Sequence, residues 1–229
     1  KYAFLMAKNV QDITPTRKFA ELEKILYCDK RYKEIDSNFK KTLKLLNKLQ
    51  IWQYYGLPVK AIKYNMVEKV DDRVLGLLID IVDTVNPECL QTFLEDFLKK
   101  QFGFNSKQIQ KIFTYIAGYY DALRGMQNKE YFFKYFEYVS VIFPLLSKKR
   151  KDVMNKYLFF YEYIIRHGLV IRVADLKINA DDIEKNFPNI DKRSYDRILE
   201  NLLSKVFDGK LNNEKEYLLQ EIDANLQNY

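Results

Sequence analysis

The chain has 229 residues, of which 48% are hydrophobic and 30% charged, a composition typical of folded globular proteins rather than disordered chains. That length is enough for one large domain or two modest ones with real hydrophobic cores. Only seven glycines and five prolines are present, about half the usual usage. Tight β-turns need these residues, so their scarcity predicts long helices with short connections. It argues against large β-rich folds and glycine-dependent nucleotide folds.

The 38 basic and 31 acidic residues give a net charge of +7, but the excess is unevenly spread. Residues 1–174 carry a net charge of +11, whereas residues 175–229 contain 8 basic and 12 acidic side chains. A basic body favours a polyanionic partner, most simply a nucleic acid. The alternative is that the surplus charge serves solubility alone.

The cysteines and the histidine form no recognisable chemical site. Cys28 and Cys89 lie far apart without a C-x-x-C spacing, and His167 is the single histidine. We therefore expect two buried thiols in a reducing cytosol and no zinc site. No apolar run reaches the roughly 18 residues needed to span a bilayer, and no signal-peptide pattern is present. These features predict a cytoplasmic protein that does not use a membrane.

Helical periodicity extends over nearly the whole chain and predicts an all-α fold. Residues 71–83 are apolar almost all round and are expected to form a central helix. Pro144 is expected to end the helix that begins near Phe132, and Asn105, Asp191 and Asn213 are expected to cap helices. Gly209 is expected in a left-handed conformation after the helix at 191–208. A change of composition near Gly168 separates a multi-helix body from a small helical C-terminal tail. In chain order, the expected helices cover residues 2–10, 15–26, 36–55, 71–83, 87–100, 105–123, 132–143, 148–168, 191–208 and 213–222.

The sequence contains none of the common catalytic constellations. It has no D-x-D pair for two magnesium ions and no glycine-rich loop for phosphate. Asp80 and Asp83 are interpreted as surface or partly buried acids of a central helix rather than metal ligands. Glu95 to Lys99 resembles an E-D-x-x-R pattern, but a lysine cannot replace the planar, bidentate guanidinium of arginine. We therefore predict no catalytic residue and no metal ligand in this chain.

Clusters of basic side chains are the remaining candidates for a binding site. The densest is the run Lys148, Lys149, Arg150 and Lys151, which follows Pro144 and is expected near a helix start. Positive charge is unfavourable for the helix dipole there, so a contact with phosphate explains the run better than local structure does. A solvated turn is the alternative. Lys107 and Lys111, one helical turn apart, form a second candidate.

Two C-terminal segments, DLKINADDI (175–183) and RILENLLSKVFDGKLNNEKEYLL (197–219), stand in order near the end of the chain. They resemble the end of bacterial CCA-adding tRNA nucleotidyltransferases. Family tails read D-L-x-I-N-G-x-D-L, then I-L-x-x-L-L-x-x-V, then G-K and N-E-x-E-x-L-L. Two departures are visible. Ala180 stands where the family has a glycine and would strain a left-handed turn. Asp191–Arg193 stand in place of a P-G-P-like turn.

A second match lies near the start of the chain, in the order that the family has. ITPTRKFAELEKIL (13–26) is similar to the family's neck motif I-S-x-E-R-I-x-x-E-L-x-K-I-L, with Arg17 and Glu21 among the matching residues. The resemblance implies a neck at residues 1–56, a body at 57–168 and a tail at 169–229. The family's catalytic head precedes the neck and is not part of this sequence. The resemblance implies Mg²⁺, ATP and CTP for the whole enzyme but no cofactor in this chain.

By resemblance, we expect the chain to bind tRNA through A-form shape and phosphates, while the whole enzyme adds C, C and A to tRNA 3′ ends. One alternative is a helical protein-interaction scaffold with no RNA role. Another is a related enzyme that adds only part of the CCA end, or poly(A). The residues expected to contact RNA are all basic: Lys107, Lys111, Lys148, Lys149, Arg150, Lys151, Arg166, Arg172, Lys177, Lys192 and Arg193.

Overall fold

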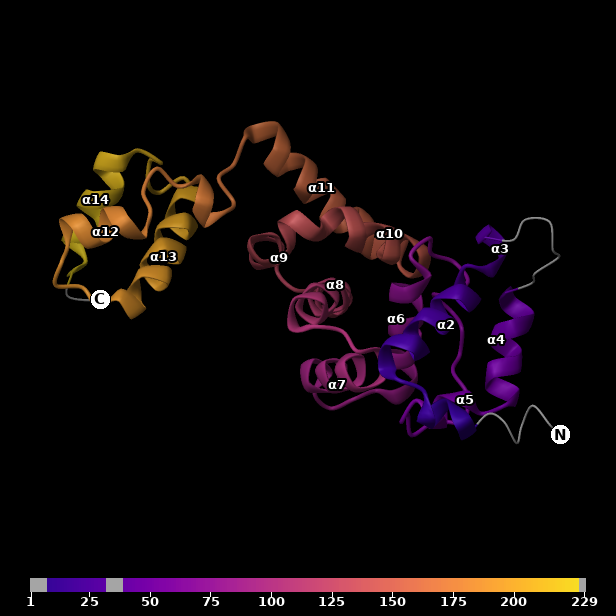
Figure 1. Cartoon of the computed structure of the whole chain (residues 1–229). Helices are drawn as coiled ribbons and strands as arrows, with labels where there is room; N and C mark the ends of the chain where they lie inside the picture. Colours follow the sequence, from indigo (N-terminus) through magenta and orange to yellow (C-terminus); the bar gives the residue numbers. More distant parts are fainter. Residues whose placement is uncertain (1–7, 32–38, 227–229) are drawn as a thin grey trace. The chain divides into compact units, whose positions relative to one another are not determined.

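The computed structural model describes residues 8–31 and 39–226 (Figure 1). Within these ranges the chain forms helices, turns and irregular segments and no strand, which confirms the all-α fold. Most of the helix expected at residues 2–10 lies outside the described residues. The three-part division into neck, body and tail depends on the resemblance and stays a prediction.

The chain folds into two compact units. Unit 1 comprises Lys1–Met126 and Glu137–Asn155, and unit 2 comprises Gln127–Phe136 and Lys156–Tyr229. Unit 1 contains 25 basic and 17 acidic residues, whereas unit 2 contains 13 basic and 14 acidic residues. The positive charge noted in the sequence therefore belongs to unit 1.

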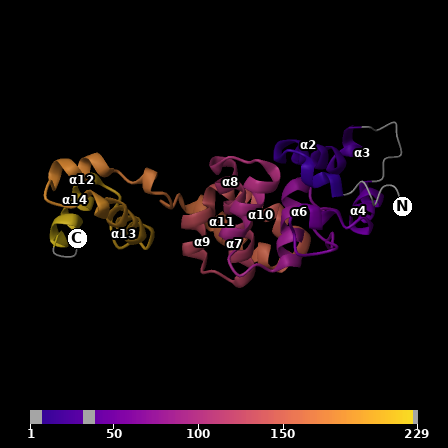
Figure 2. The same cartoon turned by 60° about the horizontal axis from the view of Figure 1, so that its bottom comes forward.

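Unit 1 is built around the buried helix α6 (Figures 1 and 2). Every residue of α6 from Leu75 to Val82 is buried, as the all-round apolar sequence predicted. Helices α2 and α8 both contact α6, and α10 packs against α8. In chain order the elements are η1 (Lys8–Asp12), α2 (Pro15–Leu26), α3 (Cys28–Arg31), α4 (Phe39–Lys48), α5 (Ile51–Tyr54), α6 (Arg73–Val85), α7 (Leu90–Phe97), the π-helical turn η2 (Leu98–Phe102), α8 (Ser106–Arg124) and α10 (Val139–Lys149).

The expected single helix at 36–55 is wrong, because the helix breaks after α4. Gln50 adopts a left-handed conformation with φ of 54°, and α5 starts at the next residue. The break turns Trp52 into the core, where it is fully buried. Its indole N–H donates to Asn47 Oδ1 and to the Tyr64 hydroxyl, both at 2.9 Å. A buried tryptophan with a satisfied N–H compensates for the strained backbone at Gln50.

Pro144 does not end a helix, contrary to expectation. It lies inside α10, and the preceding helix α9 (Asn128–Tyr135) gives way to the 3₁₀ turn η3 (Phe136–Tyr138) instead. Proline removes one backbone hydrogen bond in a helix interior. Burial of Ile142, Leu145 and Leu146 on α10 provides the packing that keeps this helix continuous.

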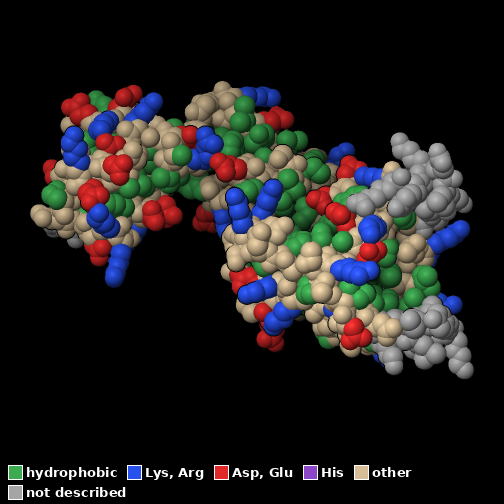
Figure 3. All heavy atoms as spheres, in the orientation of Figure 1, with side chains coloured by type: hydrophobic (Ala, Val, Ile, Leu, Met, Phe, Trp, Pro, Cys, Tyr) green, Lys and Arg blue, Asp and Glu red, His purple; other side chains and the backbone are tan. Residues whose placement is uncertain are grey.

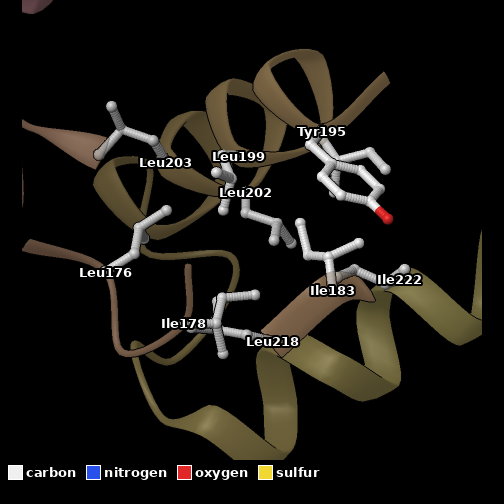
Figure 4. Close-up of a cluster of buried hydrophobic side chains, with 10 residues drawn as sticks. Leu176, Ile178, Ile183, Tyr195, Leu199, Leu202, Leu203, Leu218 and Ile222 are labelled. Atoms are coloured by element: carbon white, nitrogen blue, oxygen red, sulfur yellow. The ribbon is translucent and has the colours of Figure 1, made fainter. Parts of the chain in front are cut away.

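Unit 2 has a compact core of ten buried side chains contributed by its last three helices and the loop before them (Figure 4). They are Leu176, Ile178, Ile183, Tyr195, Ile198, Leu199, Leu202, Leu203, Leu218 and Ile222. The elements of unit 2 are α9, α11 (Lys151–His167, assigned to unit 2 from Lys156), η4 (Val173–Asp175), α12 (Ala180–Asn186), η5 (Lys192–Ser194), α13 (Tyr195–Phe207) and α14 (Lys215–Ala224).

The local expectations for unit 2 had mixed outcomes. Gly209 adopts the left-handed conformation expected after α13. The strain expected at Ala180 does not arise, because Ala180 is the first residue of α12 and Asn179 caps that helix in a capping box with Asp182. Asn213 does not cap α14; Glu214 occupies that position without a side-chain hydrogen bond. Asn213 instead bonds to the loop before α12, as described below.

Both cysteine thiols were expected to be buried, and this was wrong. Cys89 is exposed and Cys28 is partly exposed, and both are free thiols. Cys89 precedes α7, and its sulfur lies 3.2 Å from the Thr92 hydroxyl. This interaction lowers the pKa of the Cys89 thiol below its ordinary value.

Candidate nucleic-acid interface

A broad concentration of positive charge lies on α4 and on the segment between α5 and α6. Residues 39–70 contain seven lysines and a single acidic residue, Glu68. All seven lysines are exposed, and blue side chains project from the edge of unit 1 at α4 (Figure 3). We name this set the lysine surface: Lys40, Lys41, Lys44, Lys48, Lys60, Lys63 and Lys69.

Asn47 holds the two parts of the lysine surface together. Its side-chain amide donates to the Ile62 carbonyl at 2.8 Å and its oxygen accepts from the Ile62 N–H at 3.0 Å. The Tyr64 hydroxyl also donates to this oxygen at 3.0 Å. At the other end of α4, Lys40 forms a 3.1 Å ion pair with Glu68. The segment carrying Lys60 and Lys63 is therefore fixed beside α4 rather than free in solvent.

Asp80 anchors the same segment to the core. This carboxylate is 1% exposed and accepts hydrogen bonds of 2.8–3.0 Å from the backbone N–H groups of Asn65, Met66 and Val67. Burial raises the pKa of Asp80 to about 6, although the three N–H donors act in the opposite direction. The expectation of a surface or partly buried acid was wrong: Asp80 is a buried anchor for the backbone that leads into α6.

The run at residues 148–151 lies at the junction of two helices, because α10 ends at Lys149 and α11 (Lys151–His167) starts two residues later. Lys148 and Lys149 are in the last turn of α10, where cations are favourable for the dipole. Lys149 donates to Asp83 at 2.6 Å, and Arg150 pairs with Asp152 at 2.7 Å. The argument that the helix dipole disfavours these charges was therefore wrong for Lys148 and Lys149, and it applies only to Lys151 at the start of α11. A phosphate contact by this run stays a prediction.

Lys107 and Lys111 lie one turn apart on α8, as expected, and both are exposed. Asn105 caps this helix through a capping box with Gln108, which fixes its first turn. Lys111 also borders an open groove of about 490 Å³ between α2 and α8. The ammonium lies 5.9 Å from the centre of the Tyr115 ring.

The candidates in unit 2 are mostly engaged in local ion pairs. Arg172 pairs with Asp175 at 2.6 Å, Arg166 lies 3.3 Å from Glu162, and Lys192 pairs with Glu184. Pairing of this kind at a surface contributes little stability and is easily exchanged for another anion. Lys177 and Arg193 are exposed in the turns that precede α12 and α13. The five candidates of unit 2 and the six of unit 1 belong to separate compact units.

The neck-like residues lie on α2. Leu22 and Leu26 are buried in unit 1, whereas Arg17 is exposed. Glu21 pairs with Lys24 at 2.9 Å, and this hydrogen bond holds the pKa of the Glu21 carboxyl below its usual range. The motif therefore combines buried leucines with a solvent-facing polar row.

The residues of the tail-like motif meet in space. Its apolar members form most of the core of unit 2 (Figure 4). Asn213 joins the two halves of the motif, because its side chain donates to the Asp175 carbonyl and accepts from the Lys177 N–H, both at 3.0 Å. The apolar matched positions and Asn213 thus have a structural role, because they hold the loop 175–179 against α13 and α14.

Sequence reasoning missed the lysine surface. The signal was available, because seven lysines and one acidic residue within 32 positions is a strong local bias. Apart from the adjacent Lys40 and Lys41, these lysines are separated by other residues, so they form no run as conspicuous as residues 148–151. Their proximity depends on Asn47, and no sequence pattern indicates that contact.

Comparisons with protein-family models, with curated proteins and with solved structures found no match. Within the described residues, no helix combines the length and the apolar character needed to cross a membrane.

Proposed function

We propose that this chain is an RNA-binding part of a nucleotidyltransferase that adds CCA to tRNA 3′ ends, and that its lysine surface contacts the tRNA backbone. The observation that carries the proposal is the density of exposed lysines on α4 and residues 60–69, which include a single acidic residue, Glu68. A fixed array of ammonium groups suits phosphates, because each ammonium that binds a phosphate releases a condensed counterion from the RNA.

The resemblance of residues 13–26 and 175–219 to CCA-adding enzymes is the reason for choosing tRNA. Supporting evidence is that the matched residues of the tail are contiguous in space, with Asn213 bridging the loop at 175–177. The acidic balance of unit 2 favours unit 1 as the main phosphate-binding part. Nucleotide addition with Mg²⁺, ATP and CTP would be the task of the catalytic head in the whole enzyme.

The test is tRNA binding measured by filter retention at several salt concentrations. The variant replaces Lys44, Lys48 and Lys63 by glutamine, because all three lysines are exposed on the lysine surface. Binding should weaken at low salt, and the slope of log affinity against log salt should flatten by up to about 0.9 for each phosphate that these lysines neutralise in the wild type. A control variant with the same charge change replaces Lys24, Lys99 and Lys100 by glutamine and should bind more nearly like the wild type.

Two outcomes would contradict the proposal in different ways. Unchanged affinity and salt slope in the first variant would show that the lysine surface does not contact RNA. If the wild-type chain does not bind tRNA at low salt, the RNA role itself fails, and a helical protein-interaction scaffold becomes the better interpretation.

A further inference from the structure

One side of α11 exposes aromatic rings to solvent. Phe159, Tyr163 and His167 are spaced four residues apart, which aligns them along one side of the helix. Phe159 is 76% exposed and Tyr163 is 44% exposed. The rings of Tyr163 and His167 lie with centroids 4.1 Å apart and planes tilted by 33°. We name these three side chains the aromatic ladder; hydrophobic atoms are visible on the surface of α11 in Figure 3.

The packing of unit 2 accounts for only part of the aromatic ladder. Tyr163 stacks on Phe160 with ring centroids 6.0 Å apart, and His167 Nδ1 lies 2.8 Å from the Tyr163 carbonyl oxygen, whereas Phe159 is 76% exposed. The buried residues of α11 are Tyr157 and Ile164, and the Tyr157 ring lies 4.3 Å from that of Tyr131 on α9. Phe159 follows Tyr157 by two residues, about 200° around the helix, so it points away from this core. A phenylalanine held in water at that exposure contributes little to folding, which makes a binding role the better explanation.

The charges beside the ladder are suited to an anionic partner. Lys156 precedes Phe159 by three residues and Arg166 follows Tyr163 by three, so a cation stands near each end. The Arg166 side chain is 75% exposed, and its ion-pair partner Glu162 is half exposed, so this pair can open to admit another anion. Aromatic rings alternating with exposed cations are typical of sites where bases stack and phosphates pair with lysine or arginine.

The ladder is a row of side chains on a single helix. A protein helix as partner would need an apolar groove, whereas the residues beside the ladder include the polar Asn155 and Glu162.

From this arrangement we propose that the aromatic ladder is a stacking platform for unpaired nucleobases, with Lys156 and Arg166 contacting the adjoining phosphates. The inference rests on the proposed RNA binding. It adds that unit 2 binds the exposed bases of a loop or a strand end rather than the backbone of a double helix. The lysine surface of unit 1 and the ladder of unit 2 would then contribute different binding modes, one strongly salt-dependent and one less so.

The experiment compares two RNA probes with the same stem, a stem-loop carrying 2-aminopurine in its unpaired loop and a blunt duplex. Wild-type protein should bind the stem-loop more tightly and quench the 2-aminopurine fluorescence, because stacking quenches this base. The Phe159→Ala/Tyr163→Ala variant should bind the stem-loop about 5- to 140-fold more weakly for each stacked base, with most of the quenching abolished. Its affinity for the duplex should not change.

Two further variants test whether ring stacking is the interaction and whether it is specific to the aromatic ladder. Phe159→Leu/Tyr163→Leu keeps apolar side chains without rings and should behave like the alanine variant if stacking is the interaction. Tyr217→Ala removes another exposed tyrosine, 48% exposed on α14, and should bind both probes like the wild type. Thermal unfolding should stay unchanged in all three variants, since exposed side chains contribute little to folding.

Each other outcome overturns a specific claim. Wild-type affinity and quenching in the alanine variant would show that the ladder does not meet bases, and so would a wild-type protein that binds both probes equally without quenching; either result leaves RNA binding intact. Wild-type behaviour of the leucine variant would show an apolar contact instead of stacking. If the wild-type chain binds neither probe at low salt, the proposed function fails together with this inference.

Discussion

The backbone N–H of Met66 donates to both carboxylate oxygens of Asp80, at 2.8 and 3.0 Å. Asp80 lies within the buried helix α6, while Met66 belongs to the segment that carries Lys63 and Lys69. The contact therefore couples the core of unit 1 to the position of the lysine surface. A change at Asp80 should affect both stability and the order of residues 60–69.

We predict that Asp80→Asn destabilises unit 1 by about 2–4 kcal/mol. The asparagine keeps one acceptor oxygen, but its amide group faces N–H donors and leaves at least one of them unsatisfied in a buried site. Chemical denaturation followed by circular dichroism measures the change. Asp71→Asn, at an exposed carboxylate near the start of α6, is the control and should change stability by no more than about 0.5 kcal/mol. Equal stability of the two variants would contradict the anchoring role.

The raised pKa of Asp80, about 6, predicts a specific pH dependence of stability. In the unfolded chain this carboxyl has its ordinary pKa of 3.8, whereas the folded chain keeps the proton up to about pH 6. Between these values the folded state binds more protons, so the contribution of Asp80 to stability falls as pH rises. We expect the stability difference between wild type and Asp80→Asn to decrease by about 2–3 kcal/mol from pH 4 to pH 7.

Measuring the difference between the two proteins removes the effects of other carboxyl groups. Asp29, Asp175 and Asp208 have lowered pKa values because they pair with Arg73, Arg172 and Lys129, and they add stability as pH rises from acid. These pairs are present in both proteins and cancel. A difference that grows between pH 4 and pH 7 would mean that the N–H donors outweigh burial and that the pKa of Asp80 is lowered.

The sequence correctly predicted the helical features that depend on residues close to one another in the chain. The all-round apolar sequence of α6, the cap of α8 at Asn105 and the left-handed Gly209 all depend on residues within a few positions of one another. It failed where the deciding contact is distant. The donors to Asp80 lie 13–15 residues earlier in the chain, and Asn213 bonds to residues 36–38 positions away. No local sequence pattern indicates such distant hydrogen-bond partners.

The same limit applies to the candidate interface. The basic run at 148–151 was conspicuous in sequence, yet its placement relative to the helix end depended on Pro144 remaining within α10. In the sequence, the lysine surface appears only as an excess of lysine spread over residues 39–70. Its assembly in space requires the hydrogen bonds of Asn47 to Ile62. Charge composition could be read from the sequence, whereas the arrangement of the charges could not.

Gly76 provides a test of the packing between α6 and the segment before it. A Cβ atom at this position would lie 2.6 Å from Val70 Cγ2 and 2.8 Å from the Val67 Cα atom. Glycine to alanine in a helix interior normally stabilises by about 1 kcal/mol. Here the backbone of Val67 must move, and Asp80 holds that backbone, so Gly76→Ala should destabilise by about 1–3 kcal/mol. Chemical denaturation measures the change, and a gain in stability would show that the segment shifts freely.

Asn213 should be the most sensitive polar side chain of unit 2. It links the turn before α14 to the loop at 175–177 through both ends of its side-chain amide. Replacing it by alanine leaves the Lys177 N–H and the Asp175 carbonyl without this partner, at an expected cost of about 1–3 kcal/mol. The neighbouring Asn212 is exposed and makes a matched control, with an expected change within about 0.5 kcal/mol. Hydrogen exchange should quicken at Lys177 in Asn213→Ala and stay unchanged in Asn212→Ala. Equal protection of that amide in both variants would show that the core residues alone hold the loop in place.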